Sequence, residues 1–369
     1  MGRAKPLTIH PRVNKKTCGR RLPLAIGTNC TKGELLMKHR FASRVPEASR
    51  RRLSWMKPGR GFGLGRRRLV AALGVAAALA IATAAPPAQA ELPVGGLNEA
   101  ISATMFSPKQ VPGANDWNCK PTAVHPRPVV LVHGTFENMG FNWATLSPML
   151  KNAGYCVFAL NYGYNLLSLD QRFSGLDDIA KSADQLRAFV DRVLAVTGAT
   201  KVDIVGHSQG GMMPNYYIKR LGGASKVNML VGLAPSNHGT TLSGIQTLGK
   251  QLGLLTGFNT LAMLAAPSLV QQQVGSSFQN ALFADGDTVP GVKYVVIATK
   301  KDLIVTPYTN AFLSGSNVRN ITIQDQCPTN NVGHIGLNYD SPTMQNVLNV
   351  LGPNVPNFRA VCTNFGPPI

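Results

Sequence analysis

One serine stands in a sequence context that can make it a nucleophile. Residues 206–210, Gly-His-Ser-Gln-Gly, have the form G-x-S-x-G. The apolar run 202–205 before them is typical of a short buried strand, and residues 212–221 after them have helical spacing. A serine at a strand-to-helix turn needs small neighbours, because its backbone is strained and both elements crowd it. The context predicts that Ser208 is a nucleophile and that the Gln209 N–H points the same way.

Such a serine needs a base within hydrogen-bond reach and a carboxylate that orients the base. His334 is the candidate base, because it lies in a glycine-flanked loop after the last clear strand. Its rival is His238, which follows another strand end. For the carboxylate, Asp302 closely follows a strand, and Asp325, nine residues before the base, is its rival. If no such partners surround Ser208, it is a bystander in a tight turn.

The other residues that could carry chemistry have plainer interpretations. His133 and His207 lie inside two glycine turns and are interpreted as structural. Asp285-Gly286-Asp287 resembles part of a calcium loop, but this tripeptide is usually an ordinary turn. No C-x-x-C pair is present after residue 90, which disfavours zinc. We therefore expect no metal.

Strand-like runs alternate with helical patterns along the chain. The expected strands are 128–132, 156–160, 202–205, 227–233, 294–298 and 320–323, and the expected long helices are 143–153, 176–197 and 212–221. This alternation predicts one α/β domain with a mostly parallel, doubly wound sheet and helices on both faces. In such sheets functional groups gather at the carboxyl ends of the strands, where every candidate named above falls.

The positive charge is concentrated at the front of the chain. The formal net charge is +20, of which residues 1–90 carry +17 and residues 91–369 carry +3. A basic surface that would bind nucleic acid is therefore not expected on the main domain. A basic arm within 1–55 is the alternative, although we expect translation to start at Met37 or Met56.

Residues 56–90 have the pattern of an export signal. A basic start is followed by the 17-residue apolar run 69–85 and by Ala88-Gln89-Ala90, an A-x-A cleavage site. The run is short for a membrane anchor, which needs ~20 strongly apolar residues. We expect 1–90 to be extension and signal, and 91–369 to be a secreted catalytic domain.

Four cysteines remain in the expected mature chain, and four cysteines allow three connectivities. An even count in an exported protein points to two disulfides. Cys119 precedes the first strand and Cys156 begins the second, so this pair can tie residues 91–120, the entry segment, to the sheet. Cys327 leads into the His334 loop and can pair with Cys362 in the tail.

The order Ser208, Asp302, His334 resembles that of the α/β-hydrolases. Four stretches are similar to secreted actinobacterial lipases and related esterases, namely 116–119, 129–138, 234–240 and the His334 loop. The resemblance covers nearly all of 110–362 and implies hydrolysis of lipid esters, typically acylglycerols, outside the cell and without a cofactor. It also implies that Thr135 or Phe136 donates a second N–H, beside that of Gln209, to an oxyanion hole.

The apolar stretch 240–291 interrupts the alternation of strands and helices. We interpret it as a cap or lid-like insertion that forms either the acyl groove or a lid. The expected partners are lipid or other ester substrates and a lipid–water interface. Ordinary helices packed on the sheet are the alternative. Three other functions fit the same residues: an acyltransferase, a polyester depolymerase, and a binding protein without activity. The complete triad argues against the last.

Overall fold

The computed structural model describes residues 90–252 and 265–369. Its sheet has the order β2-β1-β3-β4-β5-β6, and each neighbouring pair is parallel. The strands are β1 Val129–Val132, β2 Val157–Leu160, β3 Val202–His207, β4 Val227–Leu233, β5 Lys293–Ala298 and β6 Val318–Thr322. The predicted parallel α/β sheet is confirmed, with strand ends shifted by up to two residues.

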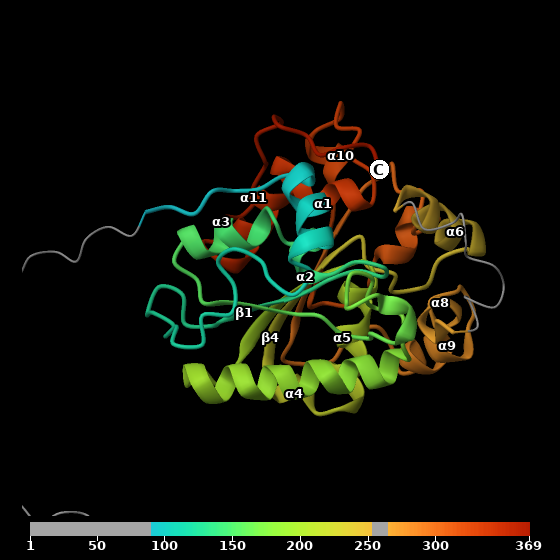
Figure 1. Cartoon of the computed structure of the whole chain (residues 1–369), viewed down its shortest axis with the longest axis horizontal. Helices are drawn as coiled ribbons and strands as arrows, with labels where there is room; N and C mark the ends of the chain where they lie inside the picture. The colour runs from blue at the N-terminus through green and yellow to red at the C-terminus, as the bar shows by residue number, and fades with distance from the viewer. Residues whose placement is uncertain (1–89, 253–264) are drawn as a thin grey trace, which may run out of the picture. The chain divides into compact units, whose positions relative to one another are not determined.

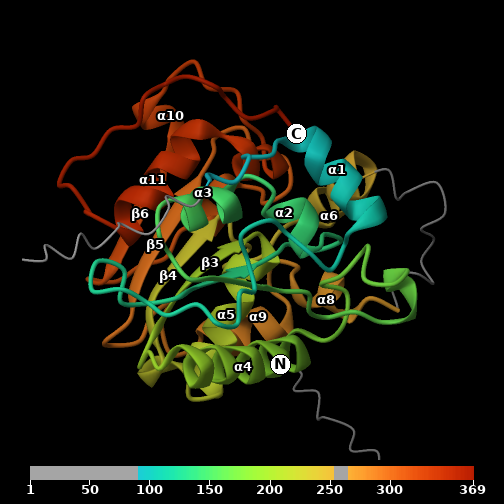
Figure 2. The ribbon, with the colours of Figure 1, turned by 60° about the vertical axis from the view of Figure 1, so that its left-hand side comes forward.

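Helices cover both faces of this sheet, as Figures 1 and 2 show. On one face α4 (Ile179–Thr197) and α5 (Gln209–Arg220) pack on Val130 and Val132. On the other face α3 (Leu146–Asn152) and α11 (Ser341–Leu351) pack on Val129 and Leu131. Successive residues of β1 thus enter different cores, which explains why the strand is an unbroken apolar run rather than an alternating one.

Local signals set the ends of the longest helix. The Asp178 side chain accepts a hydrogen bond from the Lys181 N–H at 3.0 Å, and Gly198 ends α4 in the left-handed region at φ 74°. Between these ends, Ile179, Leu186 and Val190 are fully buried on one face. The expected helix 176–197 is therefore confirmed, beginning three residues later than predicted.

Neither the entry segment nor the C-terminal region was expected to contain a helix. The entry segment contains α1 (Leu97–Phe106), and the C-terminal region contains α11, which is capped by Asp340. The expected helix 143–153 is shorter, because residues 139–142 form a separate turn, α2 (Met139–Asn142). The other α-helices in the described residues are α6 Leu242–Gln251, α8 Pro267–Gln271, α9 Ser277–Phe283 and α10 Ile323–Gln326.

Both expected disulfides are present. Cys119 is bonded to Cys156, and Cys327 is bonded to Cys362, with sequence separations of 37 and 35 residues. The first ties the entry segment to the start of β2. The second joins the segment before the His334 loop to the C-terminal tail.

The expected insertion 240–291 is described except for residues 253–264 and contains α6, α8 and α9. The expected export signal 56–90 lies outside the described residues except for Ala90. The division into 1–90 and 91–369 therefore stays a prediction. Among the described helices, none is long and apolar enough to cross a membrane.

Candidate active site

Ser208 stands alone between β3 and α5 in a strained conformation. Its φ of 54° and ψ of −122° lie outside the regions that residues with side chains favour. Glycine is required on both sides, because a Cβ on Gly206 would lie 1.9 Å from the Gly210 carbonyl oxygen. A Cβ on Gly210 would lie 2.2 Å from the oxygens of Val132 and His133. The G-x-S-x-G spacing thus allows strand, turn and helix to approach closely.

Asp302 and His334 come together at the carboxyl end of the sheet. Asp302 Oδ2 lies 2.8 Å from His334 Nδ1, and both side chains are buried. The other carboxylate oxygen, Oδ1, accepts hydrogen bonds from the N–H groups of Ile304 and Val305 at 2.8 and 2.9 Å. An ionised Asp302 can only accept, so His334 Nδ1 carries a proton and Nε2 is left as a base.

The loop that carries His334 is held from outside by the C-terminal tail. The N–H groups of Gly333 and Gly336 donate to the carbonyl oxygens of Pro367 and Ile369 at 3.1 and 2.9 Å. A Cβ on Gly333 would lie 2.5 Å from the Ile369 oxygen, so glycine allows the tail to lie against the loop. The disulfide Cys327–Cys362 anchors the same tail.

His334 Nε2 is buried and has no hydrogen-bond partner among residues 90–252 and 265–369. No hydrogen bond joins it to Ser208 Oγ in the described part of the chain. The neighbouring residue His207 contacts His334 instead, with ring centroids 4.8 Å apart. Catalytic hydrogen bonds are often long or poorly aligned before substrate binds. The lack of a Ser208–His334 hydrogen bond in the described residues is therefore compatible with their roles as nucleophile and base.

The two rival residues lie in other surroundings. The Asp325 side chain is 62% exposed and pairs with Lys300 at 2.6 Å. His238 faces Asp287 at 3.5 Å. Within the described part of the chain, neither has a hydrogen bond or an ion pair with Asp302 or His334. The structure therefore brings together the preferred pair and not the rivals.

The candidate oxyanion donors are reduced from three N–H groups to two. The Phe136 N–H donates to the Ser174 carbonyl oxygen at 2.8 Å, so it is already used, and its inclusion among the expected donors needs correction. The N–H groups of Thr135 and Gln209 have no acceptor within the described residues. The Gln209 side chain also donates to Thr135 Oγ1 at 2.9 Å, which holds the two donor segments together.

His133 has the structural role expected from its glycine turn. Its Nδ1 is 2.7 Å from the Gly134 carbonyl oxygen, and its Nε2 accepts from the Tyr162 N–H at 3.3 Å. Full burial lowers the pKa of His133 to about 4, although its contact with the Gly134 carbonyl acts in the opposite direction. The ring is therefore neutral at physiological pH and fastens the turn to the start of the 162–175 loop.

An apolar cavity of about 360 Å³ adjoins the candidate oxyanion loop and base loop. Phe136 and Ile335 belong to these loops, and Leu252 comes from the insertion 240–291. The largest share of the wall comes from α1, a helix that was not expected from the sequence. The full lining is Leu97, Ile101, Thr104, Met105, Phe136, Phe141, Phe173, Gln251, Leu252, Ile335 and Ile369.

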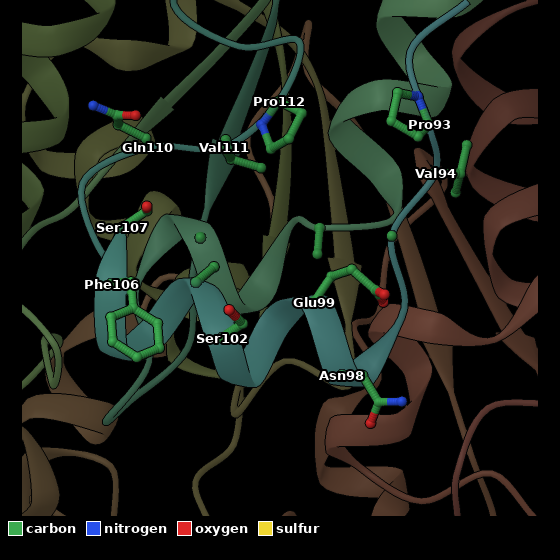
Figure 3. A pocket seen from close by; sticks show the side chains of 14 residues that line it. Pro93, Val94, Asn98, Glu99, Ser102, Phe106, Ser107, Gln110, Val111 and Pro112 are labelled. Atoms are coloured by element: carbon green, nitrogen blue, oxygen red, sulfur yellow. The ribbon is translucent and has the colours of Figure 1, made fainter.

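A larger hollow of about 710 Å³ lies on a different face of α1 (Figure 3). Glu99, Ser102 and Phe106 project into it from the helix. The Glu99 carboxylate accepts from the Gly96 N–H at 2.8 Å and so serves as part of the helix cap. None of the predicted catalytic residues lines this hollow, so size alone does not mark the active site.

The carboxylates of the 285–287 turn bind protein groups. Asp285 pairs with Lys219 and Arg220 at 2.7 and 2.9 Å, and the Lys219 hydrogen bond is the main cause that lowers its pKa to about 2. Asp287 accepts from the Ser314 N–H at 2.7 Å. Within the described ranges, no group of three or more His, Cys, Asp or Glu side chains could hold a metal ion.

Comparison with known families decides what kind of protein this is. The family described as Lipase (class 2) matches residues 126–344, which is more than half of the chain and includes Ser208, Asp302 and His334. The chain belongs to the class 2 lipase family. Its parallel sheet, helices and elbow have the α/β-hydrolase fold, as the sequence predicted.

Curated relatives of this class 2 lipase carry the name triacylglycerol lipase. Those of Pseudarthrobacter phenanthrenivorans and Burkholderia plantarii are each 37% identical over 94 residues, which is 24% of this chain and 27% and 24% of theirs. That of Vibrio cholerae is 29% identical over 169 residues, 43% of this chain and 51% of its own. The chain thus spans between about a quarter and a half of the relatives it matches.

Solved structures of lipases are similar at lower identity. Aspergillus fumigatus lipase B is 21% identical with a TM-score of 0.49, covering 67% of this chain and 60% of its own. The mature Bacillus licheniformis lipase BlEst2 is 17% identical with a TM-score of 0.42, covering 55% and 85%.

Proposed function

We propose that residues 91–369 form a secreted serine hydrolase that cleaves carboxylic esters of lipids, with Ser208, His334 and Asp302 as its triad. The observation that carries the proposal is the buried 2.8 Å contact of Asp302 with His334. It leaves Nε2 without a partner among the described residues, on a ring that contacts His207, the residue before the strained Ser208. Family membership and the names of the relatives support lipid esters as substrates.

The reaction follows from these roles. As Ser208 Oγ bonds to the ester carbonyl carbon, His334 Nε2 takes its proton and Asp302 stabilises the resulting cation. The N–H groups of Thr135 and Gln209 donate to the oxygen that becomes negative. His334 then returns the proton to the leaving alcohol. Water repeats the sequence on the acyl-enzyme and releases the acid.

The apolar cavity beside Phe136 and Ile335 is the proposed site of the acyl chain. Its walls are aliphatic and aromatic side chains, with Thr104 and Gln251 as the polar members. Burying a methylene group in such a cavity contributes ~0.8 kcal/mol, so kcat/KM should rise about fourfold per CH₂ until the cavity is full.

The proposal is tested with an organophosphonate and a series of p-nitrophenyl esters. Wild-type protein should form a covalent adduct on Ser208, and its kcat/KM should increase from acetate towards medium and long acyl chains. Ser208→Ala should form no adduct and lose nearly all turnover. Ser182→Ala is the matched control, because its hydroxyl is buried in α4, has no hydrogen-bond partner in the described part of the chain, and should be dispensable. Wild-type protein that takes no phosphonate and cleaves no ester would refute the function.

Secretion is part of the same proposal. The two disulfides are compatible with an oxidising compartment. Expression of the full chain in an exporting host should release protein whose first residue is Glu91, as N-terminal sequencing of the culture medium can determine. Recovery of secreted protein that still carries residues 1–90 would contradict the prediction that residues 56–90 are a cleaved export signal.

A further inference from the structure

A second carboxylate–histidine pair lies behind the proposed base. His207 Nδ1 is 3.0 Å from Glu137 Oε2, and His207 Nε2 is 3.1 Å from the main-chain oxygen of His334. The side chains of Glu137 and His207 are 1% and 0% exposed. Neither residue has a part in the triad or in the proposed oxyanion hole.

The hydrogen-bond chemistry defines the state of the His207 ring. A main-chain carbonyl can only accept, so Nε2 must carry a proton that it donates to His334. The remaining nitrogen faces the Glu137 carboxylate and shares a proton with it. Asn338 Nδ2 is 3.3 Å from the same nitrogen while Asn338 Oδ1 has no partner among the described residues. Exchanging the two amide atoms supplies a further acceptor to Nδ1.

The pair connects the three loops of the proposed active site. Glu137 Oε2 also accepts from the Gly134 N–H at 3.0 Å, in the loop that leads to Thr135. His207 directly precedes the Ser208 nucleophile. His207 Nε2 also contacts the main-chain oxygen of His334, which belongs to the base loop. The junction is closely packed, because a Cβ on Gly134 would lie 2.8 Å from Glu137 Oε2 and 3.0 Å from His207 Nδ1.

Stability alone is a poor reason to bury this pair. Glu137 Oε1 is buried with no hydrogen-bond partner among residues 90–252 and 265–369. Burying charged groups that are incompletely satisfied is unfavourable, and packed apolar side chains often serve a core as well or better. A pair kept in this form is expected to have a positional role.

We propose that Glu137 and His207 are positioning residues for the base. Glu137 fixes the ring of His207, and His207 fixes the main chain of His334, so that its Nε2 faces Ser208. In this arrangement Glu137 orients His207 as Asp302 orients His334, but the second pair lies one residue further from the substrate. This inference rests on the proposed ester hydrolysis and names two further residues on which its rate depends.

Glu137→Gln is the decisive variant, because it keeps the size of the side chain and an acceptor for Gly134 while removing the charge. Partners one step behind reacting groups typically contribute about tenfold to a hundredfold. We expect kcat to fall by that factor, the phosphonylation rate to fall equally, and KM to stay within about twofold. His207→Gln should act in the same way, and the double variant should lose no more than the larger single loss.

Asp203→Asn is the matched control. Asp203 is also a buried carboxylate and lies on the same strand as His207, but near its amino end, where it bonds Arg127 at 2.8 Å and Asn228 at 2.6 Å. This variant should lower the melting temperature and leave kcat unchanged. If Glu137→Gln lowers the melting temperature likewise but keeps the wild-type kcat, the pair is structural only and the inference is wrong.

A measurement on the wild-type protein guards against variants that do not fold. With ¹⁵N-labelled histidine, NMR should detect an Nε2–H on His207 that exchanges slowly with water. An unprotonated Nε2 at neutral pH would overturn the proposal, since that nitrogen could not donate to His334. Failure of the wild-type protein to hydrolyse any ester would instead refute the proposed function, so the two failures are distinguishable.

Discussion

Replacing Asp302 by Asn tests the proposed triad most sharply. Asp302 Oδ1 accepts from two main-chain N–H groups, at 2.8 Å from Ile304 and 2.9 Å from Val305. In the variant the amide oxygen must take this place, because an amide NH₂ cannot accept hydrogen bonds. The NH₂ group is thereby turned towards His334 Nδ1, where the carboxylate oxygen stood.

The consequence is the wrong tautomer of the base. Nδ1 must then accept from the amide, which moves the histidine proton to Nε2 on the side of Ser208. A protonated Nε2 cannot take the proton of the serine. The equivalent change in serine proteases lowers kcat about ten-thousand-fold, which corresponds to about 5 kcal/mol in the activation barrier. Folding should be little affected, because both main-chain donors keep an acceptor.

The assay is turnover of a chromogenic ester beside thermal unfolding of the same samples. Asp325→Asn is the control, because it makes the same chemical change on a side chain that is 62% exposed and paired with Lys300. Its kcat should stay within about twofold, since surface ion pairs contribute little. A loss below tenfold in Asp302→Asn, or a larger loss in Asp325→Asn, would show that the orienting role belongs elsewhere.

Three further predictions concern the frame around the site. Cys362→Ser opens a loop of 35 residues and should lower the free energy of unfolding by about 4 kcal/mol. It should also lower kcat, because its disulfide partner Cys327 leads into the His334 loop. Cys119→Ser should leave kcat unchanged. Gly210→Ala should prevent the elbow from forming and abolish phosphonate labelling, whereas Gly96→Ala, where a new Cβ meets nothing closer than 3.6 Å, should keep both. The pKa of His133 is about 4 in the folded protein and about 6.5 unfolded, so the unfolded state binds more protons in between. Stability should therefore fall as pH drops from about 6.5 to 4, by about 3 kcal/mol from this residue, and urea titrations should show a shallower dependence in His133→Asn.

Features that depend on neighbours along the chain could be predicted from the sequence. The elbow needs small residues at 206 and 210 wherever the strand and helix lie, because a Cβ added at these positions would lie only 1.9 and 2.2 Å from main-chain oxygens. The long helix α4 was predicted from its apolar spacing alone, whereas its cap at Asp178 was seen only in the structure. The two disulfides were predicted from where the cysteines lie relative to the expected strands and the His334 loop, and both pairs are present.

Features that depend on distances across the fold could not be predicted in this way. Asp302 and Asp325 both follow strands, and only their positions relative to His334 separate a buried partner from an exposed ion pair. From the sequence, the N–H groups of Thr135 and Phe136 were equally good candidates for the oxyanion hole. The structure separates them, because the Phe136 N–H donates to Ser174 in the 162–175 loop.

The same limit applies to the walls and supports of the site. The helix α1 has apolar residues on more than one side, so its sequence did not reveal that it lines the apolar cavity. Glu137 and His207 are 70 residues apart, and their pairing depends on the close approach of two parallel strands, β1 and β3. The sequence by itself determined the fold class. It also identified Ser208 as the candidate nucleophile and ester hydrolysis as the candidate chemistry. Which groups surround that nucleophile was decided by the tertiary structure, because hydrogen bonding and burial depend on separations of a few ångströms that residue types do not specify.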